Sequence, residues 1–203
     1  MIIIVDYGMG NLGSIRNMLK RIGVNSEVTA DARAIAAASK LILPGVGAFD
    51  AGMDNLERSG LIPTLNERVL QARVPMLGIC LGMQLMTRSS DEGQRKGLGW
   101  IDAESLRFRL ADAALKVPHM GWNRVMPVRS SPLTDDLPDE PRFYFVHSFY
   151  VRCQNESDVL LTTPYGNVFH SAFQSGNLAG VQFHPEKSHK FGMRLLRNFA
   201  ERC

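Results

Sequence analysis

The chain has 203 residues, of which 45% are hydrophobic and 21% charged, and its formal net charge is +3. This length suffices for one large domain or two small ones, and the charge is too mild to indicate a nucleic-acid-binding surface. No apolar run approaches the ~20 residues of a membrane span, and the N-terminus lacks the basic segment of a signal peptide. We therefore expect a cytoplasmic protein that binds neither nucleic acid nor a membrane.

The first half of the chain alternates between predicted strands and helices. Residues 2–5 (IIIV) form an apolar run typical of a strand that is covered on both faces. The next apolar side chains share one helical face: Leu12, Ile15, Met18, Leu19 and Ile22. The pattern then repeats, with strands expected at 25–29, 40–45 and 75–80 and helices over 61–73 and from Leu81 onward. This order predicts a parallel sheet with helices on both faces.

The second half has a different character. Residues 142–153 and 158–186 are rich in aromatic and β-branched side chains, and Gly-Asn pairs at 166–167 and 176–177 are typical of hairpin turns. These features predict antiparallel strands added to the parallel core. Residues 188–203 then predict a closing amphipathic helix.

Neither an internal repeat nor a linker interrupts the chain, so we predict one domain over residues 1–203. Its expected fold is α/β: an open, mostly parallel sheet with helices on both faces and antiparallel strands added in the C-terminal half.

Residues 8–13 (GMGNLG) match the dinucleotide-binding pattern G-x-G-x-x-G after a strand, and Glu27 and Asp31 lie near the expected acidic position. However, Asp6 and Tyr7 separate the strand from the first glycine, so the phosphate-binding turn would start late. We interpret the segment as a glycine-rich loop with another role. An NAD-dependent oxidoreductase remains an alternative that failure to bind NAD would dismiss.

Three widely spaced cysteines, without a C-x-x-C pair, indicate neither a zinc site nor disulfides. Cys153 and Cys203 are interpreted as inert. Cys80 differs because it lies between Gly78 and Gly82, where a predicted strand becomes a helix.

The spacing G-x-C-x-G corresponds to the G-x-S-x-G elbow of serine hydrolases, which exposes its nucleophile at the carboxyl edge of a sheet. The positive end of a helix favours a thiolate, and the N–H of Leu81 is expected to be free to bind an oxyanion. The alternative is a cysteine buried in the sheet core.

A thiol nucleophile requires a base. In VQFHPEKS (181–188), His184 ends a strand and Pro185 stops it, so Glu186 is able to fold back onto the imidazole. A carboxylate that holds one ring nitrogen leaves the other facing the thiol. The alternative is that His184 and Glu186 are solvated loop residues.

The elbow and the His-Pro-Glu segment, in this order, resemble the class I, triad-type glutamine amidotransferases over essentially the whole chain. LILPGVGAFD (41–50) corresponds to the oxyanion strand of that family. Within the family, several segments are similar to the glutaminase subunits of imidazole glycerol phosphate synthases: DYGMGN, PGVGAF, GICLGMQ, PHMGWN, FYFVHS and HPEKS.

The resemblance implies that Cys80 attacks the side-chain amide of glutamine, that His184 is the general base and then acid, and that Glu186 orients His184. It implies an oxyanion hole made by N–H groups of Leu81 and of the Gly45-Val46-Gly47 segment, with Gly47 as the residue of that segment. The glutamine-binding residues that it implies are Gly45, Gln84, Ser148 and Phe149, although many relatives have Tyr at the last position. The chemistry calls for no cofactor and no metal.

The resemblance also implies a heterodimer with a cyclase subunit, a (β/α)8 barrel that receives the ammonia and forms imidazole glycerol phosphate in histidine biosynthesis. The residues implied at this interface are Asn11, Trp122, Asn123, Tyr144 and Lys187; without the resemblance, Trp122 and Tyr144 would be read as core aromatics and Lys187 as a solvated charge. Because glycines permit peptide flips, Gly45 and Gly47 suggest that the oxyanion strand stays misaligned until the partner binds its substrate.

Two functional alternatives remain. A paralogous glutaminase serving another synthase, for instance in the amination of surface sugars, would use the same catalytic residues. A catalytically silent regulatory module would retain the fold without forming a thioester. His147 is interpreted as a core histidine, and His119 as a residue that shapes the interface.

Overall fold

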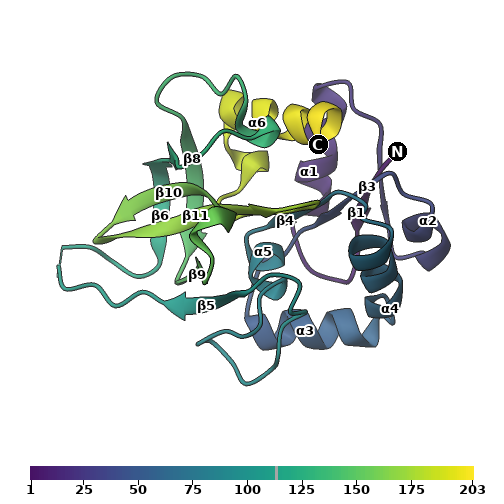
Figure 1. The fold of residues 1–203 in the computed structure, drawn as a ribbon, viewed down its shortest axis with the longest axis horizontal. Helices are drawn as coiled ribbons and strands as arrows, with labels where there is room; N and C mark the ends of the chain where they lie inside the picture. Colours follow the sequence, from purple (N-terminus) through teal and green to yellow (C-terminus); the bar gives the residue numbers. More distant parts are fainter. Residues whose placement is uncertain (113) are drawn as a thin grey trace.

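The computed structural model describes residues 1–112 and 114–203, and its centre is a ten-stranded sheet (Figure 1). Five neighbouring strands are parallel. In sheet order they are β2 (Ser26–Thr29), β1 (Ile2–Val5), β3 (Lys40–Leu43), β4 (Met76–Ile79) and β12 (Leu178–Val181). The four parallel strands predicted in the first half of the chain are confirmed. The fifth parallel strand, β12, comes from the C-terminal part of the chain and pairs with β4.

Helices cover both faces of the sheet. On one face lie α1 (Leu12–Arg21) and α6 (His189–Arg202), and on the other α2 (Ala32–Ala36), α3 (Phe49–Arg58), α4 (Ile62–Asn66) and α5 (Leu81–Leu85). The helix predicted over 61–73 divides into α4 and a π-helical turn, Glu67–Gln71. The sequence pattern does not predict α2 and α3.

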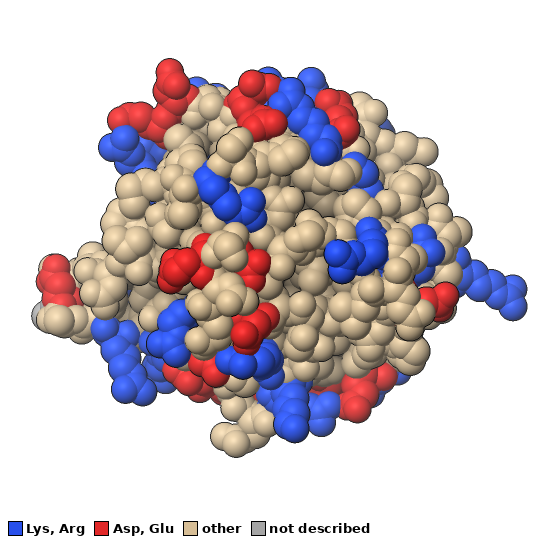
Figure 2. Space-filling model, in the orientation of Figure 1, with Lys and Arg blue, Asp and Glu red and all other residues tan. Residues whose placement is uncertain are grey.

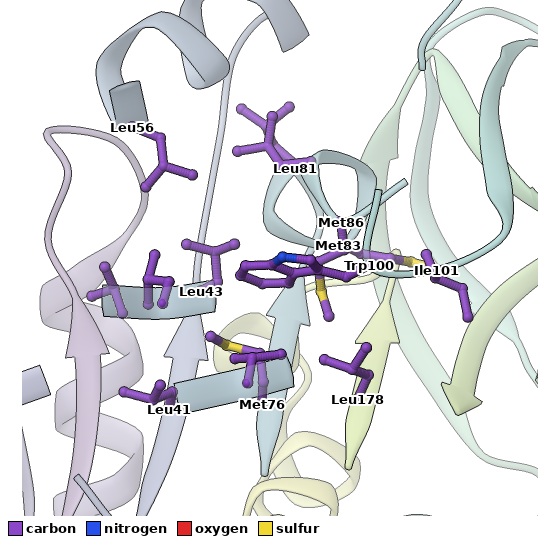
Figure 3. Packing of buried hydrophobic residues seen from close by; sticks show 14 of the residues in the cluster. Leu41, Leu43, Leu56, Met76, Leu81, Met83, Met86, Trp100, Ile101 and Leu178 are labelled. Carbon is purple, nitrogen blue, oxygen red and sulfur yellow. The ribbon is translucent and has the colours of Figure 1, made fainter. Parts of the chain in front are cut away.

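Alternating strand side chains supply the two halves of the core. Ile2, Ile4 and Ile42 pack under α1 and α6, whereas Leu41 and Leu43 face the opposite helices. Figure 3 shows part of the cluster that contains Leu41 and Leu43, in which the indole of Trp100 lies among Leu43, Met83 and Met86. Its Nε1 donates to Asn66 Oδ1 at 2.7 Å, so the one polar atom of this large side chain is paired.

Antiparallel strands extend the sheet beyond β12: β5 (Ala103–Arg107), β7 (Met126–Pro127), β9 (Phe149–Cys153), β10 (Val159–Tyr165) and β11 (Asn167–Ser175). A separate ribbon pairs β6 (His119–Arg124) with β8 (Arg142–His147). Gly166 and Gly176 turn the hairpins with φ of 70° and 57°, which confirms the two predicted turns. Short 3-10 helices cover Pro132–Thr134, Glu156–Asp158 and Pro185–Lys187.

The surface carries intermixed charges. On the face drawn in Figure 2, Lys and Arg alternate with Asp and Glu around broad uncharged areas. Exposed ion pairs include Arg88–Asp102 at 2.8 Å and Arg95–Asp54 at 3.1 Å. Among the described residues, no helix is both long enough and apolar enough to span a membrane.

Candidate active site

Cys80 occupies a strained turn between β4 and α5. Its φ of 54° and ψ of −110° are unusual for a residue with a side chain. The flanking glycines make this turn possible: a Cβ at Gly78 would lie 2.8 Å from Met83 N, and one at Gly82 would lie 1.8 Å from the carbonyl oxygen of Leu43. The spacing G-x-C-x-G is therefore a packing requirement of the elbow. Because α5 has only five residues, the helix dipole expected at the sulfur is small.

His184 and Glu186 form a buried pair beside Cys80. Nδ1 of His184 lies 2.8 Å from Oε1 of Glu186, and the two side chains are 2% and 1% exposed. The 3-10 helix Pro185–Lys187 turns the carboxylate back, and Ser188 Oγ holds the His184 carbonyl at 2.6 Å. Nε2 of His184 is buried without a hydrogen bond from the described residues. The solvated-loop alternative is wrong for both residues.

The electrostatics of this pair favour a charged imidazole. Burial alone would lower the pKa of His184, but the hydrogen bond to Glu186 and the charge interactions with Cys80 and Glu186 outweigh it and raise the pKa to about 10. A cationic imidazole beside a sulfur stabilises a thiolate. The site therefore holds the charge distribution that a thiol nucleophile needs.

A pocket of about 310 Å³ opens beside the sulfur. The predicted site residues that line it are Gly47, Cys80, Leu81, Gln84, Ser148, Phe149, His184 and Lys187. Glu186 lies behind His184, and Gly45 is not among the lining residues. Val46, from the predicted oxyanion segment, also lines the pocket, and so do four residues that the sequence does not predict there: Glu92, Pro118, Val146 and His147.

Glu92 places a carboxylate at this pocket. Its Oε2 accepts from the N–H of Phe49, the first residue of α3, at 2.8 Å. No motif surrounds Glu92 in the sequence, and the contact joins positions 43 residues apart. Only the folded chain brings it to the site.

The oxyanion donor predicted at Leu81 is already occupied. The Leu81 N–H donates to the Gly45 carbonyl at 3.3 Å, so the expectation that it is free is wrong. A carbonyl oxygen at that point repels an oxyanion. Gly47, with φ of 104°, lines the pocket two residues further on.

The GMGNLG loop supports this segment. A Cβ at Gly10 would lie 3.1 Å from Pro44 Cβ and 3.4 Å from Gly45 N. Asp31, one of the two acidic residues of the dinucleotide alternative, caps α2 by accepting from Arg33 N and Ala34 N. The loop therefore packs against the oxyanion segment.

Three of the predicted interface residues lie together. The Trp122 ring is 6.3 Å from that of Tyr144, and Lys187 Nζ is 5.7 Å from the Tyr144 ring. Trp122 is 47% exposed, so its core interpretation is wrong; on the same strand Met120 is 62% exposed. Asn123 Nδ2 donates to Pro164 O at 2.9 Å, and Asn11 is the N-cap residue of α1, a helix that contacts the 3-10 helix Pro185–Lys187.

Two buried histidines connect this ribbon to the pocket. His147 Nδ1 donates to Phe149 O at 2.7 Å, and its Nε2 lies 2.9 Å from His119 Nδ1. Burial, the main cause, lowers the pKa of His147 to about 3 and that of His119 to about 4. Both rings are therefore neutral; His147 is the core histidine that the sequence predicts, and His119 is buried beside it. Their contact joins positions 28 residues apart and is not predicted from the sequence.

A buried Cys–His–Glu group at the carboxyl edge of an open α/β sheet defines a class of enzymes that transfer acyl groups through a thiol. The sequence profile of the family "Glutamine amidotransferase class-I" matches residues 3–203. The chain is 54% identical over 203 residues to imidazole glycerol phosphate synthase subunit HisH 2 of Methanococcus maripaludis, and 50% identical over 201 residues to that of Pseudomonas aeruginosa. These alignments cover at least 99% of each chain.

The chain therefore belongs to the class I glutamine amidotransferases and, within them, to the HisH subunits of imidazole glycerol phosphate synthase. Solved structures agree on the fold. A glutamine amidotransferase structure aligns with a TM-score of 0.77 at 19% identity, covering 99% of this chain and 98% of its own. The Thermotoga maritima PurLQS structure gives 0.74 at 17% identity, covering 98% and 96%. The expected family and fold are both confirmed.

Proposed function

We propose that this chain hydrolyses glutamine to glutamate and ammonia and delivers the ammonia to a cyclase subunit that forms imidazole glycerol phosphate in histidine biosynthesis. The buried group Cys80, His184 and Glu186 beside a 310 Å³ pocket is the observation that carries this proposal. The pocket is large enough for one amino acid, and Glu92 offers a carboxylate to the α-ammonium group of glutamine.

In the proposed reaction, the Cys80 thiolate attacks the side-chain amide carbon of glutamine and the carbonyl becomes an oxyanion. Protonated His184 gives its proton to the leaving nitrogen, and ammonia departs from a thioester. A water molecule then attacks the thioester while neutral His184 accepts its proton. Glutamate leaves, and the thiolate returns. Glu186 holds the Nδ1–H of His184, so that Nε2 exchanges the proton with the reacting groups.

We further propose that the oxyanion hole forms during activation. The Leu81 N–H donates to Gly45 O, and rotation of the Gly45–Val46 peptide would remove this carbonyl and offer the Val46 N–H in its place. The neighbouring Gly47 already has a positive φ, which permits backbone rearrangement at low cost. Binding of the partner and its substrate would supply the free energy for this rotation.

The proposed partner is a cyclase with a (β/α)8 barrel. Support comes from the exposed ring of Trp122 and the exposed side chain of Met120 on β6, because exposed apolar side chains next to a pocket favour a protein interface. Lys187 both lines the pocket and lies beside Tyr144, so it would stand between the site of ammonia release and the partner. There the ammonia would join a phosphoribulosyl formimino intermediate.

The test is glutamine hydrolysis by the chain alone and with a histidine-pathway cyclase subunit plus its ribotide ligand, with Cys80→Ala as control. Because one oxyanion donor is worth roughly a hundredfold in rate, stimulation of at least that size is expected, and the mutant should lose it. Activity that the cyclase does not stimulate would indicate another synthase partner. Absence of activity and of thioester under every condition would indicate a silent module.

A further inference from the structure

One buried side-chain amide, that of Gln182, contacts the nucleophile and has no role in the proposed reaction. Gln182 lies between β12 and His184, and its side chain is 0% exposed. Its Nε2 donates to Cys80 Sγ at 3.8 Å. Its Oε1 accepts from Gln84 Nε2 at 3.1 Å. The one amide thus joins the sulfur to a residue of the glutamine pocket.

The chain of hydrogen bonds continues beyond Gln84. The same Gln84 Nε2 donates to the carbonyl of Phe149 at 3.1 Å, and that carbonyl also accepts from His147 Nδ1 at 2.7 Å. Two strand residues of the pocket, Phe149 and His147, are therefore tied to the sulfur through Gln84 and Gln182. An amide buried this deeply is costly unless both of its ends are paired, and here both ends are paired.

We propose that Gln182 is a catalytic residue: its N–H stabilises the Cys80 thiolate, and its oxygen fixes Gln84 against the glutamine substrate. This inference deepens the proposed glutaminase function and rests on it. A hydrogen bond to a charged sulfur favours the thiolate over the thiol. It does not depend on the charge of His184, so it also holds the sulfur while His184 is neutral, before the attacking water gives up its proton.

An amide suits this position because it donates to Cys80 and accepts from Gln84. A glutamate at this position would keep an acceptor for Gln84 but would place a negative charge beside the sulfur. A methionine would fill the same space and supply neither the donor nor the acceptor. The two variants therefore separate the donor role from the acceptor role.

The decisive measurement is the pH dependence of Cys80 alkylation by iodoacetamide, followed by mass spectrometry of the Cys80 peptide, because Cys153 and Cys203 are also free thiols. For Gln182→Met, the midpoint should move up by about one pH unit, corresponding to loss of one charge-assisted hydrogen bond. Gln182→Glu should move it at least as far. The control is Gln174→Met on the adjacent strand β11, whose amide oxygen accepts from Ser131 and which should leave the midpoint unchanged.

Steady-state kinetics with the cyclase and its ligand test the two roles of Gln182 separately. Gln182→Met should lower kcat about tenfold and raise KM for glutamine, whereas Gln182→Glu should lower kcat but leave KM near the wild-type value because Gln84 keeps its acceptor. An unchanged alkylation midpoint in a folded Gln182 variant would overturn the proposal, with folding checked by circular dichroism. Alkylation needs no glutamine, so this result is distinct from a failure of the proposed function, which would show as inactive wild-type protein.

Discussion

The carboxylate of Glu186 lies 2.8 Å from Nδ1 of His184, and both side chains are almost completely removed from solvent. Because Nδ1 faces a carboxylate, it carries the proton, and Nε2 is left for exchange with the substrate. Each unit of pKa shift corresponds to about 1.4 kcal/mol of interaction, and burial weakens the screening of this pair. The contact therefore sets both the orientation and the charge of the base.

Replacing Glu186 by Gln should lower kcat of the activated complex by roughly 10³-fold, because the imidazolium loses its buried anion. The raised pKa of His184 should fall toward 6.5. The active thiolate–imidazolium pair exists only below the pKa of His184, so the high-pH limb of the kcat/KM profile should move to lower pH. The exposed-surface control is Glu140→Gln, which should leave the profile unchanged. A variant whose high-pH limb stays in place would contradict this account.

The buried pair His119 and His147 should make the protein sensitive to acid. Their folded-state pKa values, about 4 and about 3, lie below the ordinary 6.5, so the unfolded chain binds more protons in the interval between. Their contribution to the free energy of unfolding is complete above pH 6.5 and is lost as the pH falls toward 4. Urea unfolding should show a loss of roughly 2 kcal/mol per histidine between pH 7 and 4.5.

The matched variants for this measurement are His147→Gln, which should reduce the pH dependence, and His189→Gln, which should not. ¹⁵N NMR should also show both buried rings neutral at pH 5.5 with the proton on Nδ1, because His147 Nδ1 faces a carbonyl and His119 Nδ1 faces an acceptor nitrogen. Titration of either ring near pH 6.5 would contradict the burial of the His119–His147 pair.

Two glycine-to-alanine substitutions should have opposite effects on stability. At Gly82 the new Cβ would lie 1.8 Å from Leu43 O, so Gly82→Ala should destabilise the fold by about 3 kcal/mol or more. At Gly13, in α1, a Cβ would meet no atom of the described residues within 4 Å, so Gly13→Ala should stabilise by about 0.5 kcal/mol. Thermal unfolding monitored by circular dichroism measures both. Equal effects of the two substitutions would show that the elbow is not sterically constrained.

Several features follow from the sequence because their causes are local. The apolar runs at 2–5, 40–45 and 75–80 determine buried parallel strands, and the Gly-Asn pairs determine two hairpin turns. Gly78 and Gly82 around Cys80 identify the elbow because no larger residue fits there. The separation of His184 and Glu186 by one residue already allows their contact. Family membership rests on these same segments.

Other features depend on contacts between residues that are distant in sequence. Leu81 has a free N–H in any local model of the elbow, and only the packing of the 44–47 segment places the Gly45 carbonyl against it. Gln84 and Gln182 are 98 residues apart, and Glu92 and Phe49 are 43 apart. The sequence thus determined the strands, the turns and the nucleophile with its base. The tertiary structure decided which backbone donor is occupied, which amide touches the sulfur and which carboxylate reaches the pocket, because each depends on where separate strands and loops meet.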